Sequence, residues 1–132
     1  MSLDRLNPEG WLRPKGYSNG VAASGRMVFV AGQIGWNPLT GEFESDDLVD
    51  QVRQALRNVV AVLAVAGVGP EHIARMTWYV LDRGEYLARA TAIGQAYRDV
   101  IGRHYSTMTA VEVSALIEAR AKVEIEVTAV GS

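Results

Sequence analysis

One segment constrains the fold of this chain more than any other. Between positions 48 and 63, apolar residues recur at spacings of three and four, which places them on one face of an α-helix. Ser45 is a suitable N-cap for this helix, and two aspartates follow it where they favour the helix dipole. Gly67 and the pair Gly69-Pro70 then end the helix. The sequence therefore predicts a long amphipathic helix with a single buried face.

Strand patterns lie on both sides of this helix. Two β-prone runs, 21–23 and 27–31, are separated by the short turn Ser24-Gly25 and predict a hairpin. Residues 73–81 carry large side chains on both faces, which is typical of a central strand. A second helix is expected over residues 84–102, and the last third of the chain predicts two strands, 107–116 and 120–130.

The order of elements is thus β-β-α-β-α-β-β in a single domain over residues 1–132. Strands at both ends of the chain around two helices predict an α+β fold, a single sheet with both helices packed on one face. The second face of the sheet also needs cover, because Trp78 or Tyr79 and several valines point toward it. A second subunit is the economical solution.

Charge and residue content exclude several classes of function. The chain has 13 Lys and Arg against 15 Asp and Glu, so nucleic-acid binding, which usually needs a basic excess, is disfavoured. It has no cysteine, and His72 and His104 have no partner, so we expect no metal site. The most apolar run, residues 59–68, is about half as long as a membrane span, and the amino end lacks a secretory signal. These features predict a soluble, cytoplasmic protein.

Glutamates on the last strands are the candidate catalytic groups. Glu124 and Glu126 lie on the side of the final strand that faces away from its valines. A solvated strand face is the simpler interpretation, but a glutamate held in a cleft between subunits would position a water molecule as general base. Glu112 on the neighbouring strand allows the same two interpretations. Glycine-rich phosphate loops and the Gly-x-Ser-x-Gly motif are absent, so no other motif decides between them.

Several ordered segments carry a more specific signal. They are residues 15–21 (KGYSNGV), 28–34 (VFVAGQI), 37–42 (NPLTGE), 51–67, 76–82, and the pair 110–113 and 123–126. Together they resemble the Rid family, the reactive intermediate deaminases also called the YjgF family or liver perchloric-acid-soluble proteins. The resemblance implies a chorismate-mutase-like α+β fold with a mixed sheet and a homotrimer with three clefts between subunits. It also implies hydrolysis of imines or enamines to 2-oxo acids and ammonia, without a cofactor.

The resemblance assigns site residues position by position. Tyr17 falls on the pocket tyrosine of the family, and Gly32 with Gln33 falls on a Ser-Gly-Gln turn that lends backbone groups to the pocket. Ala31 stands where that turn has its serine. Glu124 falls on the glutamate that holds the attacking water.

One departure from the family pattern affects the chemistry. Met108 occupies the position of the arginine that clamps the substrate carboxylate, and Ala110 replaces a small polar residue or cysteine. Thr91 completes the ligand-binding residues that the resemblance implies. Since methionine offers no hydrogen-bond donor, a carboxylate in this cleft would lack its usual partner. Arg103 or Arg120 would have to reach the cleft from another position.

The sequence therefore predicts a Rid-family homotrimer that binds a small, largely apolar or neutral metabolite between subunits. Hydrolysis with water positioned by Glu124 is the expected chemistry if the ligand is turned over. Two alternatives remain open, an imine or enamine deaminase that uses another arginine and a non-catalytic binding or chaperone-like module. An endoribonuclease is disfavoured by the acidic charge balance.

Overall fold

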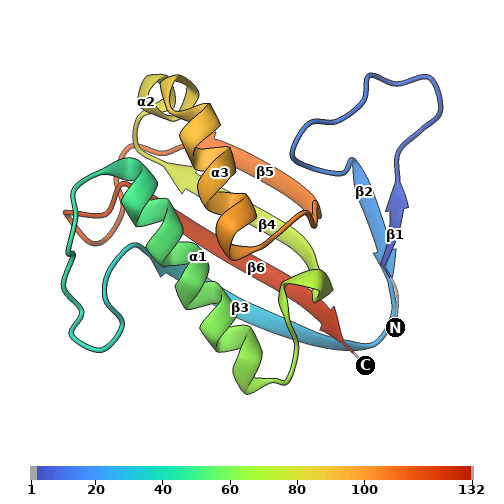
Figure 1. The fold of residues 1–132 in the computed structure, drawn as a ribbon, viewed down its shortest axis with the longest axis horizontal. Helices are drawn as coiled ribbons and strands as arrows, with labels where there is room; N and C mark the ends of the chain where they lie inside the picture. Colours follow the sequence, from blue (N-terminus) through green and yellow to red (C-terminus); the bar gives the residue numbers. More distant parts are fainter. Residues whose placement is uncertain (1–2, 132) are drawn as a thin grey trace.

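The computed structural model describes residues 3–131, and its helices and strands form the α+β arrangement of Figure 1. In chain order the elements are β1 (Leu3–Leu6), β2 (Gly20–Ala23), β3 (Arg26–Ile34), α1 (Leu48–Val65), the 3-10 turn η1 (Pro70–His72), β4 (Ile73–Val80), α2 (Arg83–Ala88), α3 (Ala90–Val100), β5 (Thr107–Glu112) and β6 (Val123–Gly131). The α+β class and the mixed sheet with its helices on one face are confirmed.

The main sheet has the strand order β3-β6-β4-β5. β4 and β5 run parallel, while β6 is antiparallel to both of its neighbours, β3 and β4. A parallel pair needs a crossover connection, and α2 and α3 provide it by crossing over one face of the sheet (Figure 1). β4 therefore lies inside the sheet, as its large side chains on both faces predicted.

The predicted hairpin of residues 21–23 and 27–31 is wrong. β2 pairs antiparallel with β1, from Leu3 opposite Ala23 to Leu6 opposite Gly20, whereas β3 pairs with β6. Gly25 has a φ of 145°, in the region that favours glycine, and the chain passes there from one sheet to the other instead of folding back on itself. The result is a separate two-stranded sheet beside the main one (Figure 1).

The long helix α1 forms as its periodicity predicted. Its inward positions include Val52, Ala55, Leu56, Val59 and Leu63, all fully buried. Its N-cap is Asp47 and not Ser45, because the Asp47 carboxylate accepts a hydrogen bond from the backbone N–H of Asp50 at 3.1 Å. The Ser45 hydroxyl instead accepts from the backbone N–H of Asp47.

The second helix is divided in two at Arg89. α2 begins after Asp82, whose carboxylate accepts from the backbone N–H of Glu85, and only Arg89 lies between the end of α2 and the start of α3. The Arg89 guanidinium lies 2.9 Å from the Asp47 carboxylate. This hydrogen bond holds the pKa of Asp47 below its usual range. Asp47 therefore both caps α1 and ties it to the junction of the other two helices.

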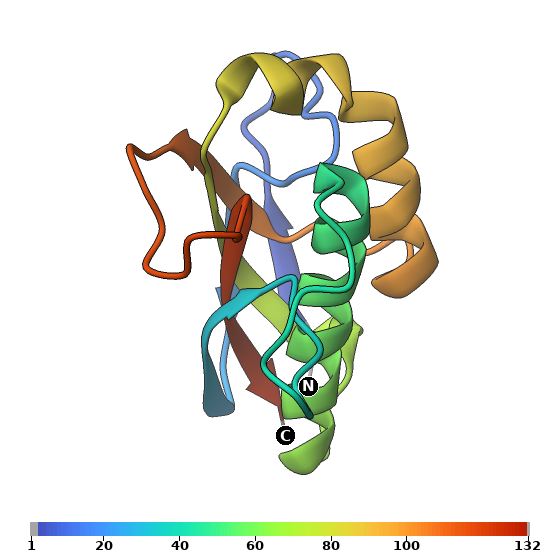
Figure 2. The ribbon, with the colours of Figure 1, turned by 90° about the vertical axis from the view of Figure 1, so that its left-hand side faces the viewer.

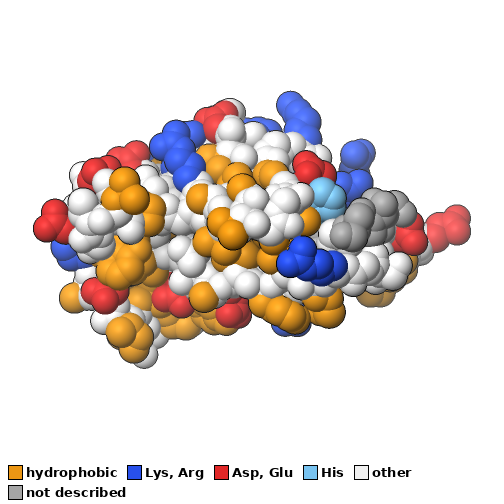
Figure 3. Space-filling view, turned by 90° about the horizontal axis from the view of Figure 1, so that it is seen from below, with side chains coloured by type: hydrophobic (Ala, Val, Ile, Leu, Met, Phe, Trp, Pro, Cys, Tyr) orange, Lys and Arg blue, Asp and Glu red, His pale blue; other side chains and the backbone are white. Residues whose placement is uncertain are grey.

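The alternation of side chains gives the sheet two different faces. Met76, Trp78 and Val80 of β4 are buried beneath the helices, together with every second residue of β6. Figure 2 shows all the helices on one side of the sheet and none on the other. On that uncovered face Phe29 is 71% exposed and Met27 57%. Hydrophobic side chains gather along the lower side of the molecule in Figure 3.

Gln51 joins the start of α1 to the chain before β6. Its side-chain amide donates to the carbonyls of Ser45 and Arg120, and its side-chain oxygen accepts from the backbone N–H of Lys122. The residue is 1% exposed, so these bonds satisfy backbone groups that water does not reach. They fix the position at which β6, and with it Glu124, enters the sheet.

We predict that Asp47→Ala lowers the free energy of unfolding by about 1–2 kcal/mol, because the cap of α1 is lost. Asp47→Asn keeps a capping oxygen and loses only a half-exposed ion pair, so it should cost a few tenths of a kcal/mol, roughly. Since the folded-state pKa of Asp47 is lowered, the ion pair stabilises above the unfolded pKa and is lost as pH falls through the folded one. Denaturant titrations at neutral and acidic pH should therefore show the difference between wild type and Asp47→Asn vanishing in acid. A stability difference between the two proteins that persists at acidic pH would contradict a stabilising role for the Asp47–Arg89 ion pair.

Candidate functional site

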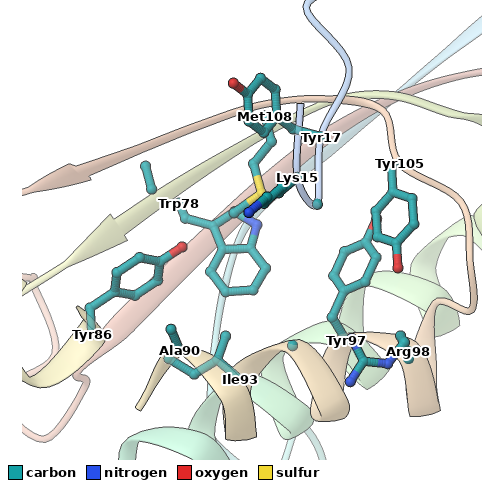
Figure 4. Close-up of a pocket in the computed structure, with 13 residues that line it drawn as sticks. Lys15, Tyr17, Trp78, Tyr86, Ala90, Ile93, Tyr97, Arg98, Tyr105 and Met108 are labelled. Carbon is teal, nitrogen blue, oxygen red and sulfur yellow. The ribbon is translucent and has the colours of Figure 1, made fainter. Parts of the chain in front are cut away.

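A cavity of about 420 Å³ lies on the helix side of the sheet, between α3 and β5. Figure 4 shows its walls, formed by side chains of α3 below, Trp78 at the centre, and Met108 with Lys15 and Tyr17 above. Ala110 on β5 also lines it. The strand register explains this placement, because Met108 pairs with Met76 and Ala110 with Trp78, on the face that the helices cover.

The segment that carries Lys15 and Tyr17 is fastened to the start of β5. The backbone N–H of Ser18 donates to the carbonyl of Ser106 at 2.9 Å, and the Ser18 hydroxyl donates to the carbonyl of Tyr105 at 2.6 Å. Ser18 and Ser106 are both buried. Although this segment lies far from β5 in the sequence, these bonds make it a fixed wall of the cavity.

Aromatic rings form the deep side of the cavity. Trp78 lies edge-on to Tyr86 with ring centroids 6.4 Å apart, and Tyr97 stacks on Tyr105 at 5.7 Å. The Tyr97 hydroxyl donates to the carbonyl of His104. Burial raises the pKa values of Tyr86 and Tyr97, so both phenols stay neutral at physiological pH. The rings therefore offer flat apolar surface with neutral hydroxyls.

The structure brings together three of the residues named from the sequence, since Tyr17, Met108 and Ala110 all line this cavity. Thr91 lies exposed on α3 and is not among the lining residues, whereas its neighbour Ala90 is.

Of the remaining predicted residues, Glu124 and Ala31 lie on the other side of the sheet, whereas Gln33 pairs with the buried Ile125 and does not line the cavity. Glu124 is opposite Tyr79 in the β4–β6 pair, among side chains that alternate with the buried ones. The Tyr79 hydroxyl donates to the carboxylate of the next outward residue, Glu126, and this bond raises the pKa of Tyr79. Since Met108 faces the helices, one chain does not bring Glu124 and Met108 to the same face.

Gly32 lies directly beneath the Glu124 side chain. A Cβ atom at this position would lie 2.2 Å from Oε2 of Glu124. The register of β3 against β6 shifts between Val30 and Gln33, so Ala31 and Gly32 fall in a bulge. Bulges redirect side chains, and here the bulge and the missing Cβ leave room for the carboxylate.

Two other candidate side chains, Glu112 and Arg120, form hydrogen bonds within the chain. The Glu112 carboxylate accepts from the backbone N–H of Arg83 at the start of α2, at 2.7 Å. Arg120 donates to Asp46 and to the carbonyl of Phe43, and its guanidinium lies over the Phe43 ring. Neither Arg120 nor Arg103 lines the cavity. Two other cations do line it, Lys15 and Arg98, which sequence reasoning did not place there.

Residues 3–131 contain no cluster of three or more His, Cys, Asp or Glu side chains able to hold a metal ion. None of the helices in this part of the chain is both long and apolar enough to cross a membrane.

Comparisons with known proteins add a family to this geometry. The family model described as Endoribonuclease L-PSP matches residues 12–131. A RutC family protein of Pyrococcus horikoshii is 35% identical over 100 residues, which cover 76% of this chain and 75% of the relative. TdcF of Escherichia coli, named as a candidate reactive intermediate deaminase, is 36% identical over 82% of this chain and 81% of its own.

Solved structures of members of the same family also resemble this chain. The Rid family protein YyfB of Yersinia pestis superimposes with a TM-score of 0.86 at 33% identity, covering 99% of this chain and all of the other. The structure of Escherichia coli TdcF with bound serine superimposes with a TM-score of 0.70 at 33% identity, over 100% of this chain and 99% of the other.

Two glycine substitutions should separate side-chain displacement from backbone collision. Gly32→Ala meets the far end of the flexible Glu124 side chain, so we expect it to turn the carboxylate away at a cost below about 1 kcal/mol. In Gly35→Ala the new Cβ would lie 2.5 Å from Cα of Gln51 in α1, and we expect a loss of about 3 kcal/mol or more. Denaturant titration measures both, and the carboxyl carbon resonance of Glu124 reports its displacement. Equal costs for the two variants would contradict this account.

Proposed function

The chain belongs to the endoribonuclease L-PSP family, whose Rid and RutC members it matches over most of its length, and from this premise we propose that it hydrolyses a small imine or enamine. The cavity beside Met108 binds the substrate. The observation that carries the proposal is the pairing of a preformed aromatic cavity on one face of the sheet with a glutamate held over Gly32 on the other. The candidate binding site and the candidate base therefore lie on opposite faces of the sheet.

In the proposed assembly of several copies, the Glu124 face of one chain meets the cavity of another. The uncovered face carries Phe29 and Met27, which are largely exposed in the single chain and are suited to contact another copy. In the proposed homotrimer the β3–β6 face of one copy closes the cavity of the next, so Glu124 of one subunit faces the substrate bound by its neighbour. Exposed apolar side chains on a face without helices support this arrangement.

The reaction that fits these groups is hydrolysis of a C=N bond. An enamine first tautomerises to the imine. Glu124 accepts a proton from a water molecule as the water oxygen bonds to the imine carbon, and the proton passes to nitrogen. The resulting carbinolamine loses ammonia as its C–N bond breaks, and a carbonyl group remains. No electron acceptor is needed, because the carbon is not oxidised.

A non-catalytic ligand-binding protein is the second candidate. It is favoured by the placement of Glu124 across the sheet from the cavity, because a single chain then has a binding site without a base. RNA is not the proposed substrate, since the chain has a net charge of −2 and the cavity has the size of a small molecule.

We predict that the protein accelerates release of 2-oxobutyrate and ammonia from freshly generated 2-iminobutyrate. Glu124→Gln should lower this rate by about 100-fold, the usual loss for a general base. Glu126→Gln is the matched control, because Glu126 lies on the same strand and the same face and should leave the rate within about twofold of wild type. Equal losses in both variants would point to a structural effect. No turnover by the wild type would favour the binding protein.

A mixing experiment tests whether two copies share one site. Ala110→Trp fills the cavity but leaves Glu124 intact, whereas Glu124→Gln leaves the cavity intact. When the two inactive variants are refolded together, about one quarter of the clefts in random trimers combine an open cavity with an intact glutamate. Activity should recover to about that fraction of wild type. No recovery from assembled mixtures would contradict the shared site.

A further inference from the structure

Met108 gives the aromatic cavity a chemically reactive wall. Among the described residues it is the only sulfur-containing side chain that lines this cavity, and it packs half-buried against the hydrophobic core. A small molecule that enters the cavity therefore meets its thioether, which is a soft, polarizable group and a weak hydrogen-bond acceptor. Met76, which pairs with Met108 on the neighbouring strand and faces the same way, is only 1% exposed.

A hydrogen-bond donor without a partner lies in the same wall. The indole Nε1–H of Trp78 is buried and has no acceptor in the part of the chain that the structure describes. The β4–β5 register pairs Met108 with Met76 and Ala110 with Trp78, so Met108 and Trp78 are diagonal neighbours on the covered face. Figure 4 shows the nitrogen edge of the indole turned toward the side of the cavity where Met108 lies. A buried donor without an acceptor is unfavourable, and an oxygen atom on the sulfur of Met108 would satisfy it.

We propose that Met108 is a site of reversible oxidation by peroxides, and that the Trp78 indole N–H donates to the sulfoxide oxygen that results. The sulfur lone pair attacks one peroxide oxygen, so an S–O bond forms as the O–O bond breaks. The leaving hydroxide takes the proton from the new S–OH group and becomes water. The sulfur loses two electrons, the peroxide gains them, and methionine sulfoxide remains, which a methionine sulfoxide reductase converts back.

Oxidation changes what the cavity offers to any molecule that enters it. The β5 side of the wall then carries a polar, chiral group in place of a flexible apolar one, and the indole N–H is no longer free. The local change in polarity makes the cavity sensitive to the peroxide level around the protein. Neither the modification nor its hydrogen bond depends on whether the chain hydrolyses imines, so both can be tested separately from the proposed function.

Peptide mapping of the full-length protein after treatment with hydrogen peroxide tests the modification. Trypsin releases residues 104–120 as a peptide whose only methionine is Met108, and residues 76–83 as one whose only methionine is Met76. In the folded protein the first peptide should gain one oxygen atom under conditions in which the second gains none, whereas in denaturant both should be oxidised. Because the indole donor lies on one side of the sulfur, one sulfoxide epimer should exceed the other by about fourfold or more. The two reductases each reduce one epimer and so measure this ratio.

Two variants test the role of the indole. Trp78→Phe removes the donor but keeps an aromatic ring, so the two epimers should form in about equal amounts. Trp36→Phe is the matched control, since Trp36 does not line the cavity, and it should keep the excess of one epimer. In ¹⁵N-labelled protein the Trp78 indole resonance is identified among the three tryptophans by its loss in Trp78→Phe. This resonance should move downfield on oxidation of the wild type and stay in place when Met108→Leu is treated in the same way.

Several results would overturn the proposal. One is a Met108 thioether that stays reduced in the folded protein under conditions that oxidise it fully in denaturant. Others are equal amounts of the two epimers in the wild type and a Trp78 resonance that oxidation does not move. An equal shift of that resonance in Met108→Leu would also overturn it, because the shift would then arise elsewhere. The proposed function fails on different evidence, the absence of turnover or an unaffected rate of imine hydrolysis in Glu124→Gln.

Discussion

The packing of α1 and α3 against one face of the four-stranded sheet is the constraint on which the rest of the structure depends. It buries every second side chain of β4 and β6 and leaves the alternate ones on a face without helices. Each strand therefore carries two chemically different sets of residues. The aromatic cavity is on the covered side, where α3 stands away from β5, and the carboxylates of Glu124 and Glu126 are on the other.

The parts of the fold that follow from local periodicity were predictable. The apolar spacing of α1 and the alternation of β6 identify these elements, because burial of one face imposes a pattern on the sequence. The pairing of β2 was not predictable in this way. A short strand and a turn containing Gly25 suit a hairpin or a change of sheet equally well, and the polar segment that holds β1 has no alternation to reveal its partner. The helix break at Arg89 was not predictable either, because residues 86–92 contain no Gly or Pro to mark it, and Arg89 pairs with Asp47, far away in the sequence.

In the candidate site, too, some residue positions follow from the strand pattern and others depend on tertiary contacts. Strand alternation alone already puts Met108 and Ala110 with the buried face and Glu124 opposite, so the two halves of the site follow from the sequence once the strands are known. The cations do not. Lys15 reaches the cavity because two buried serines fasten its segment to β5, and Arg98 lies at the cavity wall on α3, where its guanidinium donates to the Gln95 side chain. Long charged side chains carry no periodic signal of where their ends lie.

This arrangement separates binding from turnover. The side chains that line the cavity, Lys15, Trp78 and Arg98 among them, all belong to one chain and one side of its sheet. The carboxylate that would activate water reaches a cavity only across a contact between copies. Under this proposal a single chain keeps its affinity for the ligand, whereas hydrolysis appears only with assembly.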